Sequence, residues 1–162
     1  MTRVALGFAV AIALGSLSIA QADDLVVRKD LSLSLARTIA EAALGECKQQ
    51  GFNTAVVVLD RAGQVLVTLR DEGASPITLE MARRKAYTAK MFRSSTLDWA
   101  KRTAEPAFAG QRDLADVLAL GGGVPVMVGN DAIGAVASSG ASPERDDACA
   151  RAGIAKVADA LK

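Results

Sequence analysis

Length and composition place this chain among single-domain globular proteins. It has 162 residues, of which 51% are hydrophobic, 23% charged and 4% aromatic, and its formal net charge is +1. That apolar fraction excludes a disordered chain, and two cysteines are too few for a small domain built on disulfides. The balance of charges argues against a general nucleic-acid binder, which is normally strongly basic.

The first 22 residues differ from the rest. One positive charge at Arg3 precedes an apolar run, and the run ends at Ala20-Gln21-Ala22, which has the small residues of a cleavage site. This pattern predicts a secretory signal peptide over residues 1–22 and a single mature domain over residues 23–162. A transmembrane anchor is the alternative, but the apolar core is shorter than the roughly 20 residues that a span needs. We therefore expect a periplasmic or secreted protein with no membrane span after cleavage.

Charges in the expected mature domain are balanced overall and uneven locally. Residues 1–22 hold one of the 19 basic residues and none of the 18 acidic ones, which leaves 18 of each sign. The segment from Pro76 to Arg102, however, contains seven basic residues and only two acidic ones, Glu80 and Asp98. The seven are Arg83, Arg84, Lys85, Lys90, Arg93, Lys101 and Arg102. Such a patch can receive anionic ligand groups, although a solvated helix face or a subunit contact explains any single one of these residues.

The first half of the domain predicts a helix, a hairpin and a second helix. Apolar residues recur at helical spacing from Ser32 or Ser34, either of which can cap the helix, to about Gln50. Two β-branched runs, residues 54–60 and 64–70, are joined by a short turn containing Gly63, which predicts a β-hairpin. Pro76 then opens a helix that we expect to reach about Phe92.

The second half predicts a further hairpin and a final helix. A helical piece over residues 95–103 is stopped by Pro106, and residues 114–120 fit either a short helix or the lead into a strand. Strands over residues 124–128 and 132–139 form the second hairpin, and Pro125 indicates either the start of a strand or an edge position for the first of them. A last helix runs from Ser142-Pro143 to Leu161. The order predicts an α+β domain with an antiparallel sheet and helices packed against its faces.

Cys47 and Cys149 are the only cysteines, and both lie in expected helices. An oxidising compartment permits them to pair if the first and last helices pack side by side. Burial of two free thiols as small apolar side chains is the alternative. Their sequence positions leave both alternatives open.

The chain contains no histidine, and this limits its chemistry more than any motif does. Serine–histidine–aspartate and cysteine–histidine catalysis are excluded, as are most zinc sites. Gly121-Gly122-Gly123 lacks the spacing of a dinucleotide-binding loop and the lysine of a phosphate-binding loop. Backbone flexibility between two strands, or the close approach of a neighbouring chain, explains these glycines better than a ligand does.

Several separated motifs resemble the GlcG/HbpS-like haem-binding family. They are Ala82-Arg83-Arg84-Lys85-Ala86-Tyr87-Thr88-Ala89, Gly121-Gly122-Gly123-Val124-Pro125-Val126, Ile133-Gly134-Ala135-Val136-Ala137-Ser138-Ser139-Gly140, and Glu144 followed by Asp147-Ala148-Cys149-Ala150. The resemblance covers about residues 31–161. It implies a profilin-like fold in α/β/α layers, with a five-stranded antiparallel sheet and helices on both faces. It also implies a homo-oligomer that binds haem, another tetrapyrrole or a related anionic small molecule.

The resemblance and the cationic stretch together suggest a ligand site at Arg84, Lys85, Tyr87 and Thr88. Arg84 and Lys85 could pair with haem propionates, while Tyr87 or Thr88 offers an oxygen to the iron. Because histidine is absent, the other conceivable iron ligands are Lys85, water and a few sulfur atoms. These sulfur atoms belong to Met91, Met127, Cys47 and Cys149. Ordinary helix packing at a subunit contact is the competing interpretation of Tyr87 and Thr88.

Two other functional classes remain open. The first is an isomerase-like or hydrolase-like enzyme with a site at a subunit interface, using Lys85, Tyr87 and a carboxylate such as Glu80 or Asp147. The second is an accessory partner of an extracytoplasmic oxidation or signalling system. A haem-degrading activity is attached to the family name, but no catalytic apparatus for it is visible in the residues. We therefore favour an exported binding protein over an enzyme.

Overall fold

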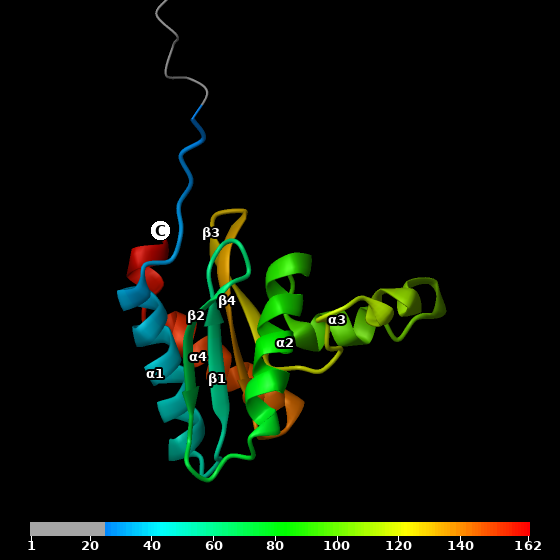
Figure 1. Cartoon of the computed structure of the whole chain (residues 1–162), viewed down its shortest axis with the longest axis horizontal. Coiled ribbons are helices and arrows are strands. Elements are labelled where there is room, and N and C mark those ends of the chain that lie inside the picture. Colours follow the sequence, from blue (N-terminus) through cyan, green and yellow to red (C-terminus); the bar gives the residue numbers. More distant parts are fainter. Residues whose placement is uncertain (1–24) are drawn as a thin grey trace, which may run out of the picture.

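The computed structural model describes residues 25–162, which form three layers with a sheet in the middle (Figure 1). The predicted signal peptide, residues 1–22, lies outside the described residues. The helices are α1 (Leu33–Gln49), α2 (Ile77–Phe92), α3 (Thr96–Arg102) and α4 (Pro143–Ala155), with 3₁₀ segments η2 (Pro106–Asp113) and η3 (Ala158–Leu161). The strands are β1 (Ala55–Leu59), β2 (Val65–Arg70), β3 (Gly123–Val128) and β4 (Asp131–Ser139).

The sheet is antiparallel throughout, in the order β2-β1-β4-β3. Each predicted hairpin forms one half of it, and the halves join where Val57 of β1 faces Ala137 of β4. β3 is an edge strand, which is one of the two positions that Pro125 indicated. Proline has no backbone N–H to donate to a second neighbouring strand, so it is tolerated at a sheet edge.

The expectation of five strands was wrong, since the described residues contain four. The segment before β3, residues 114–120, forms turns rather than a helix or a strand. Its backbone groups bond to side chains of α2 instead of to a neighbouring strand: the N–H of Leu118 donates to the Thr88 hydroxyl, and the Val117 carbonyl accepts from Arg84. With those groups satisfied, no strand ladder is needed.

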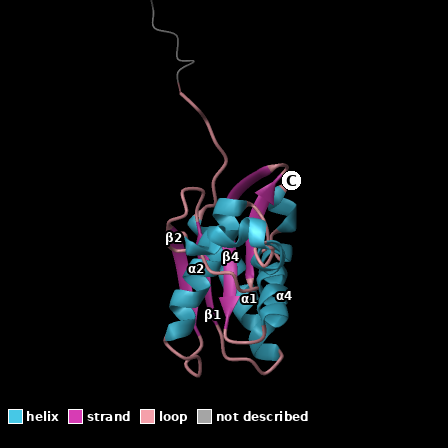
Figure 2. Ribbon diagram, turned by 90° about the vertical axis from the view of Figure 1, so that its right-hand side faces the viewer, coloured by secondary structure: helices cyan, strands magenta, loops and turns pink. Residues whose placement is uncertain are grey.

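Each face of the sheet carries its own core. Helices α1 and α4 cover one face, where buried aliphatic side chains such as Val56, Val58 and Ile133 pack against Ile39. Helix α2 covers the other face (Figure 2). There Ala82, Ala86 and Ala89 pack with aliphatic residues of β1 and alanines of β4. Because alanine side chains are short, α2 lies close to the sheet, and its longer polar side chains project past the edges of this contact.

Helix boundaries follow the caps that the sequence predicts. The Ser32 hydroxyl accepts from the N–H of Leu35 at the start of α1, and Ser142 does the same for Arg145 at the start of α4. α4 ends at Ala155 and not at Leu161, because η3 replaces its last turn. Within residues 25–162 no helix combines the length and the apolar character that crossing a bilayer demands.

Candidate functional site on helix α2

The four predicted ligand residues lie on α2 but do not share one surface. Lys85 and Thr88 are buried, Arg84 is half-buried, and Tyr87 is half-buried against the alanine-rich core. An α-helix has 3.6 residues per turn, so the side chains of residues 84 to 88 point in almost all directions around the helix axis. The structure therefore separates residues that lie side by side in the sequence.

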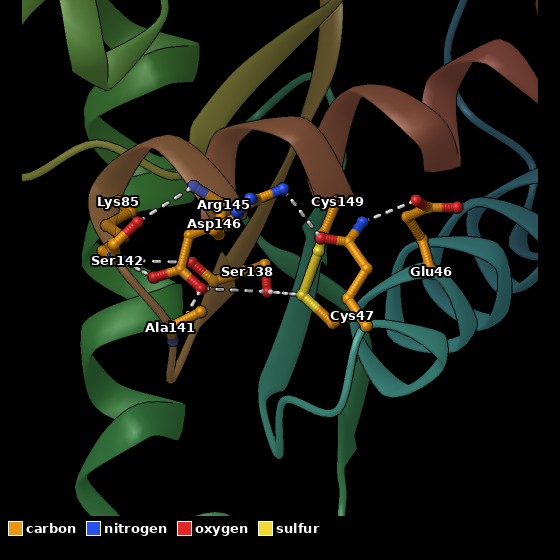
Figure 3. The surroundings of a disulfide bond; sticks show 10 residues. Glu46, Cys47, Lys85, Ser138, Ala141, Ser142, Arg145, Asp146 and Cys149 are labelled. Atoms are coloured by element: carbon orange, nitrogen blue, oxygen red, sulfur yellow. Dashed lines mark hydrogen bonds and ion pairs between the residues drawn. A yellow bond between two sulfur atoms is a disulfide. The ribbon is translucent and has the colours of Figure 1, made fainter.

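Lys85 forms a buried ion pair with Asp146. Its Nζ lies 2.8 Å from Asp146 Oδ2 and donates to the Ser138 carbonyl at 3.2 Å, and both side chains are at most 2% exposed (Figure 3). Burial lowers the pKa of the Lys85 ammonium, while the charge of Asp146 and its hydrogen bond act in the opposite direction. The second oxygen, Asp146 Oδ1, accepts from the N–H of Ala141 at 3.1 Å. Lys85 thus has a carboxylate partner within its own chain.

The glycine run 121–123 makes room for this ion pair. Gly122 has a positive φ of 126°, and a Cβ there would lie 3.0 Å from Lys85 Nζ and 2.7 Å from Asp146 Cβ. A Cβ on Gly123 would collide with the Lys85 carbonyl oxygen. Gly122 and Gly123 therefore lie against residues of α2 and α4 within the same chain.

Arg84 and Thr88 hold the loop over residues 114–120. Arg84 Nη2 donates to the Val117 carbonyl at 2.6 Å, and the Thr88 hydroxyl accepts from the N–H of Leu118 at 2.9 Å while donating to the Arg84 carbonyl at 2.8 Å. Nε of Arg84 is buried and has no hydrogen-bond partner among residues 25–162. One donor of Arg84 is therefore unused by the described protein.

Tyr87 is the predicted site residue whose hydroxyl is not engaged. No hydrogen bond joins its hydroxyl to another described residue, and its ring packs beside the β1–β2 turn. A Cβ on Gly63 in that turn would lie 3.7 Å from two Tyr87 ring carbons and in collision with Met91 Cε. Tyr87 and Met91, a full turn apart on α2, therefore offer an oxygen and a sulfur on the same side of the helix.

A groove of about 280 Å³ runs along the same side of α2, toward its N-terminus, between the helix and strand β2. The residues that line it are Val57, Val65, Thr68, Pro76, Leu79, Glu80 and Arg83. Val65 is 49% exposed because α2 does not extend over the edge strand. Arg83 is occupied by Glu80 at 2.9 Å and Asp116 at 2.7 Å, and these carboxylates raise the pKa of its guanidinium.

The other candidate residues lie elsewhere. Met127 borders a separate depression between β3 and α4, and Asp147 pairs with Arg151 at 2.6 Å. Glu80 pairs with Arg83 and Lys85 pairs with Asp146. The lysine, tyrosine and carboxylate expected for an interface enzyme are therefore not brought together within one subunit. Among the described residues no group of three or more potential metal-ligating histidine, cysteine, aspartate or glutamate side chains is present.

Cys47 and Cys149 form a disulfide, which decides between the two alternatives that the sequence left open. Their Cα atoms are 5.6 Å apart across 102 residues of sequence, and the bond joins α1 to α4 (Figure 3). Neither sulfur is free to bind iron. Cys47 Sγ lies 3.5 Å from the Ser138 hydroxyl, which itself lies 3.5 Å from Asp146 Oδ1, so the disulfide and the ion pair share one buried polar region.

The partner of Lys85 was missed by sequence reasoning. Asp146 stands in the first turn of α4, where an acidic residue is explained by the helix dipole alone. It lies 61 residues from Lys85 in the sequence, and no spacing rule connects them. The glycine run 121–123 carried only a partial signal, because glycine permits both flexibility and close approach and does not indicate which segment lies beside it.

Comparison with known proteins identifies this α+β domain. Its antiparallel sheet lies between helices on both faces, and the chain belongs to the HbpS-like family, whose model, described as haem degrading protein HbpS-like, matches residues 31–155. The Escherichia coli (strain K12) protein GlcG is 31% identical over 111 residues, covering 67% of this chain and 81% of GlcG. The family resemblance read from the sequence is confirmed.

Two solved structures have the same fold. The crystal structure of HbpS is 36% identical, with a TM-score of 0.79 over 84% of this chain and 96% of that one. The crystal structure of a complex of PduOC with haem is 27% identical, with a TM-score of 0.72 over 78% of this chain and 94% of that one. One of these two similar structures is thus a complex with haem.

Proposed function

We propose that this protein binds haem or a related tetrapyrrole without catalysing its conversion, as an exported homo-oligomer. The observation that carries the proposal is the unengaged Tyr87 hydroxyl, which lies beside Met91 on the side of α2 that borders an apolar groove. Membership of a family named for haem, and similarity to a protein crystallised with haem, support the choice of ligand.

The residues present fit a haem group in a specific way. A tyrosine oxygen is an established protein ligand of haem iron, and a methionine sulfur is another. Haem would supply the ferric ion that the Tyr87 oxygen binds. Val65 and Leu79 offer apolar contacts for a macrocycle, and Lys85, Arg84 and Thr88 then serve to position α2 and the loop over residues 114–120.

The size of the groove supports an oligomer. At about 280 Å³ it falls just below the range of roughly 300–1,000 Å³ that buries most of a drug-sized ligand, so one subunit would leave much of a tetrapyrrole exposed. Val65, which lines the groove on the edge strand β2, is 49% exposed, and Ile77, next to the lining residue Pro76 at the start of α2, is 60% exposed. A second subunit over this edge would complete the site.

Export is supported by the disulfide. Disulfides persist in oxidising compartments and are rare in the cytosol, and the sequence over residues 1–22 has the pattern of a secretory signal. We therefore propose the periplasm or the medium as the location of the mature protein, residues 23–162.

A haemin titration of the mature protein tests the proposed function. We expect a saturable shift of the Soret band at one haemin per site, and sedimentation should show an assembly larger than a monomer. A titration with no spectral change beyond that of haemin in buffer would refute haem binding. Saturable binding by a strict monomer would refute the shared site but not the ligand.

A further inference from the structure

A second pocket, of about 220 Å³, lies beyond the C-terminal end of α2. Four separate segments contribute to it: the extended chain before α1, the β1–β2 turn, the end of α2, and the start of β4. Its lining residues are Arg28, Arg61, Lys90, Met91, Arg93, Asp131 and Ala132. Four cationic side chains therefore face one carboxylate in a small volume.

Arg61 and Asp131 neutralise one another. Two guanidinium nitrogens of Arg61 donate to the two Asp131 oxygens at 3.1 and 2.5 Å, and its Nε donates to the Lys29 carbonyl at 2.6 Å. Asp30, the other nearby carboxylate, accepts from the backbone N–H groups of Leu31 and Arg61. The pair thus forms a fixed wall of the pocket, and its charges cancel.

The remaining three cations are not paired. Arg28, Lys90 and Arg93 make no salt bridge with any carboxylate among residues 25–162. The pKa of Asp131 is lowered first by Arg61 and further by the charges of Arg93 and Lys90, which places both cations within electrostatic range of the pocket. Three unpaired positive charges around one small volume attract an anion.

The backbone at Arg93 adds an independent observation. Arg93 ends α2 in the left-handed conformation, with φ 54° and ψ 35°. Glycine is the usual residue at such a helix end, because a side chain there is disfavoured by sterics. Here an arginine occupies the position and contributes to the pocket lining. A helix-dipole role would account for Lys90 and Arg93, which both stand at the C-terminal end of α2, but not for Arg28, which comes from another segment.

We propose that this pocket binds a small oxyanion, a carboxylate or a phosphate. Guanidinium groups match such anions with paired N–H donors, and Lys90 adds a point charge. Met91 and Ala132 give the pocket an apolar part that can accept a short hydrocarbon portion of the ligand. Anion binding at this pocket does not depend on haem binding. Because Met91 also lies beside Tyr87, the anion could be either a free small molecule or the carboxylate of a bound tetrapyrrole.

Titrations with inorganic phosphate and with succinate test the pocket. Binding is monitored by amide NMR, and chloride keeps the ionic strength constant. We expect saturable shifts at Lys90, Arg93 and Asp131. Arg93→Gly is the sharpest variant, because glycine suits the left-handed backbone, so the whole arginine side chain is removed without straining the helix end. It should weaken binding about tenfold, as removal of one charged hydrogen-bonding partner does. Arg37→Gln, on the exposed surface of α1, serves as the matched control and should bind as the wild type does.

Haemin and its dimethyl ester distinguish the two sources. If the anion is a tetrapyrrole carboxylate, Arg93→Gly weakens haemin binding and leaves the ester, which has no free carboxylate, unaffected. If phosphate or succinate binds and haemin does not, the pocket stands and the proposed haem function fails. The pocket is refuted if Arg93→Gly and Lys90→Gln change neither the binding of the free anions nor that of haemin.

Discussion

Lys85 of α2 and Asp146 of α4 meet as a buried ion pair although their helices cover opposite faces of the sheet. Their charged atoms are 2.8 Å apart, next to the Ser138 carbonyl of β4. Taking both charges out of water is costly, and their mutual attraction and hydrogen bonds offset that cost. The pair therefore ties the three layers together only while both partners are present.

Removing one partner should destabilise the protein strongly. Lys85→Met leaves Asp146 as an uncompensated buried charge, and we expect the free energy of unfolding to fall by about 3–5 kcal/mol in urea denaturation. The double variant Lys85→Met/Asp146→Asn should be more stable than Lys85→Met alone, because asparagine removes the charge and still accepts from Ala141. Lys156→Met on the surface of α4 should change stability by at most about 0.5 kcal/mol. A double variant no more stable than the single one would contradict this explanation.

The disulfide should contribute most of its stability by restricting the unfolded chain. The bond closes a loop of about 100 residues, for which chain entropy predicts about 4.7 kcal/mol, an upper figure because residual structure reduces it. Comparing the oxidised and the fully reduced wild type in urea changes only the two sulfurs. A thiol assay on denatured, unreduced protein should detect no free thiol. Two free thiols, or equal stability of both forms, would argue against the bond.

Gly123 and Gly45 should respond to alanine in opposite directions. A Cβ on Gly123 would collide with the Lys85 carbonyl and lie 2.9 Å from Thr96 Cγ2, so Gly123→Ala forces β3 away from α2 and should cost about 1–3 kcal/mol. Gly45 lies inside α1 with nothing within 4 Å of the added atom. Gly45→Ala should therefore stabilise the protein by up to about 1 kcal/mol. Thermal unfolding of both variants measures the two effects. Equal shifts in Tm would show that the close contact at Gly123 does not destabilise the alanine variant.

Asp71 should contribute to the acid sensitivity of the fold. A hydrogen bond from Lys48 at 2.9 Å, and one from the N–H of Gly73, lower the pKa of the Asp71 carboxyl. When the pKa of a carboxyl is lower in the folded than in the unfolded protein, the carboxyl stabilises the fold at pH values above the unfolded pKa, which is about 4. This contribution is lost as the pH falls through the folded pKa.

Unfolding in urea between pH 6 and pH 2 tests this assignment. Asp71→Asn should lose less stability on acidification than the wild type does. Lys48→Met should give a similar but smaller flattening, because the Gly73 hydrogen bond remains. Identical pH profiles for all three proteins would remove Asp71 as a cause.

Local patterns predicted the elements well because their causes are local. The Ser32 cap, the Gly63 turn and Pro125 each act through neighbouring backbone, and the corresponding helix, hairpin and edge strand are present. The strand count depended on the family resemblance, and it was wrong because side chains of α2 satisfy the backbone of the loop over residues 114–120. That arrangement depends on tertiary contacts that no periodicity records.

The candidate site was harder to predict for the same reason. The sequence drew attention to the basic segment of α2, but burial of Lys85 depends on Asp146, and the cationic pocket depends on four segments that meet only in the fold. Tyr87 is the predicted site residue with a hydroxyl left unengaged, and this could be seen only once its neighbours were placed.

Haemin binding by Tyr87→Phe tests the proposed site most directly. The substitution removes one oxygen and keeps the ring that packs beside Gly63, and Thr38→Val on α1, across the sheet, removes one hydroxyl as a control. We predict that the wild type and Thr38→Val show the same Soret shift and the absorption of a tyrosine-ligated ferric haem. Tyr87→Phe should lose that absorption and bind haemin at least about tenfold more weakly. An unchanged spectrum and affinity in Tyr87→Phe would contradict the assignment of Tyr87 to the iron.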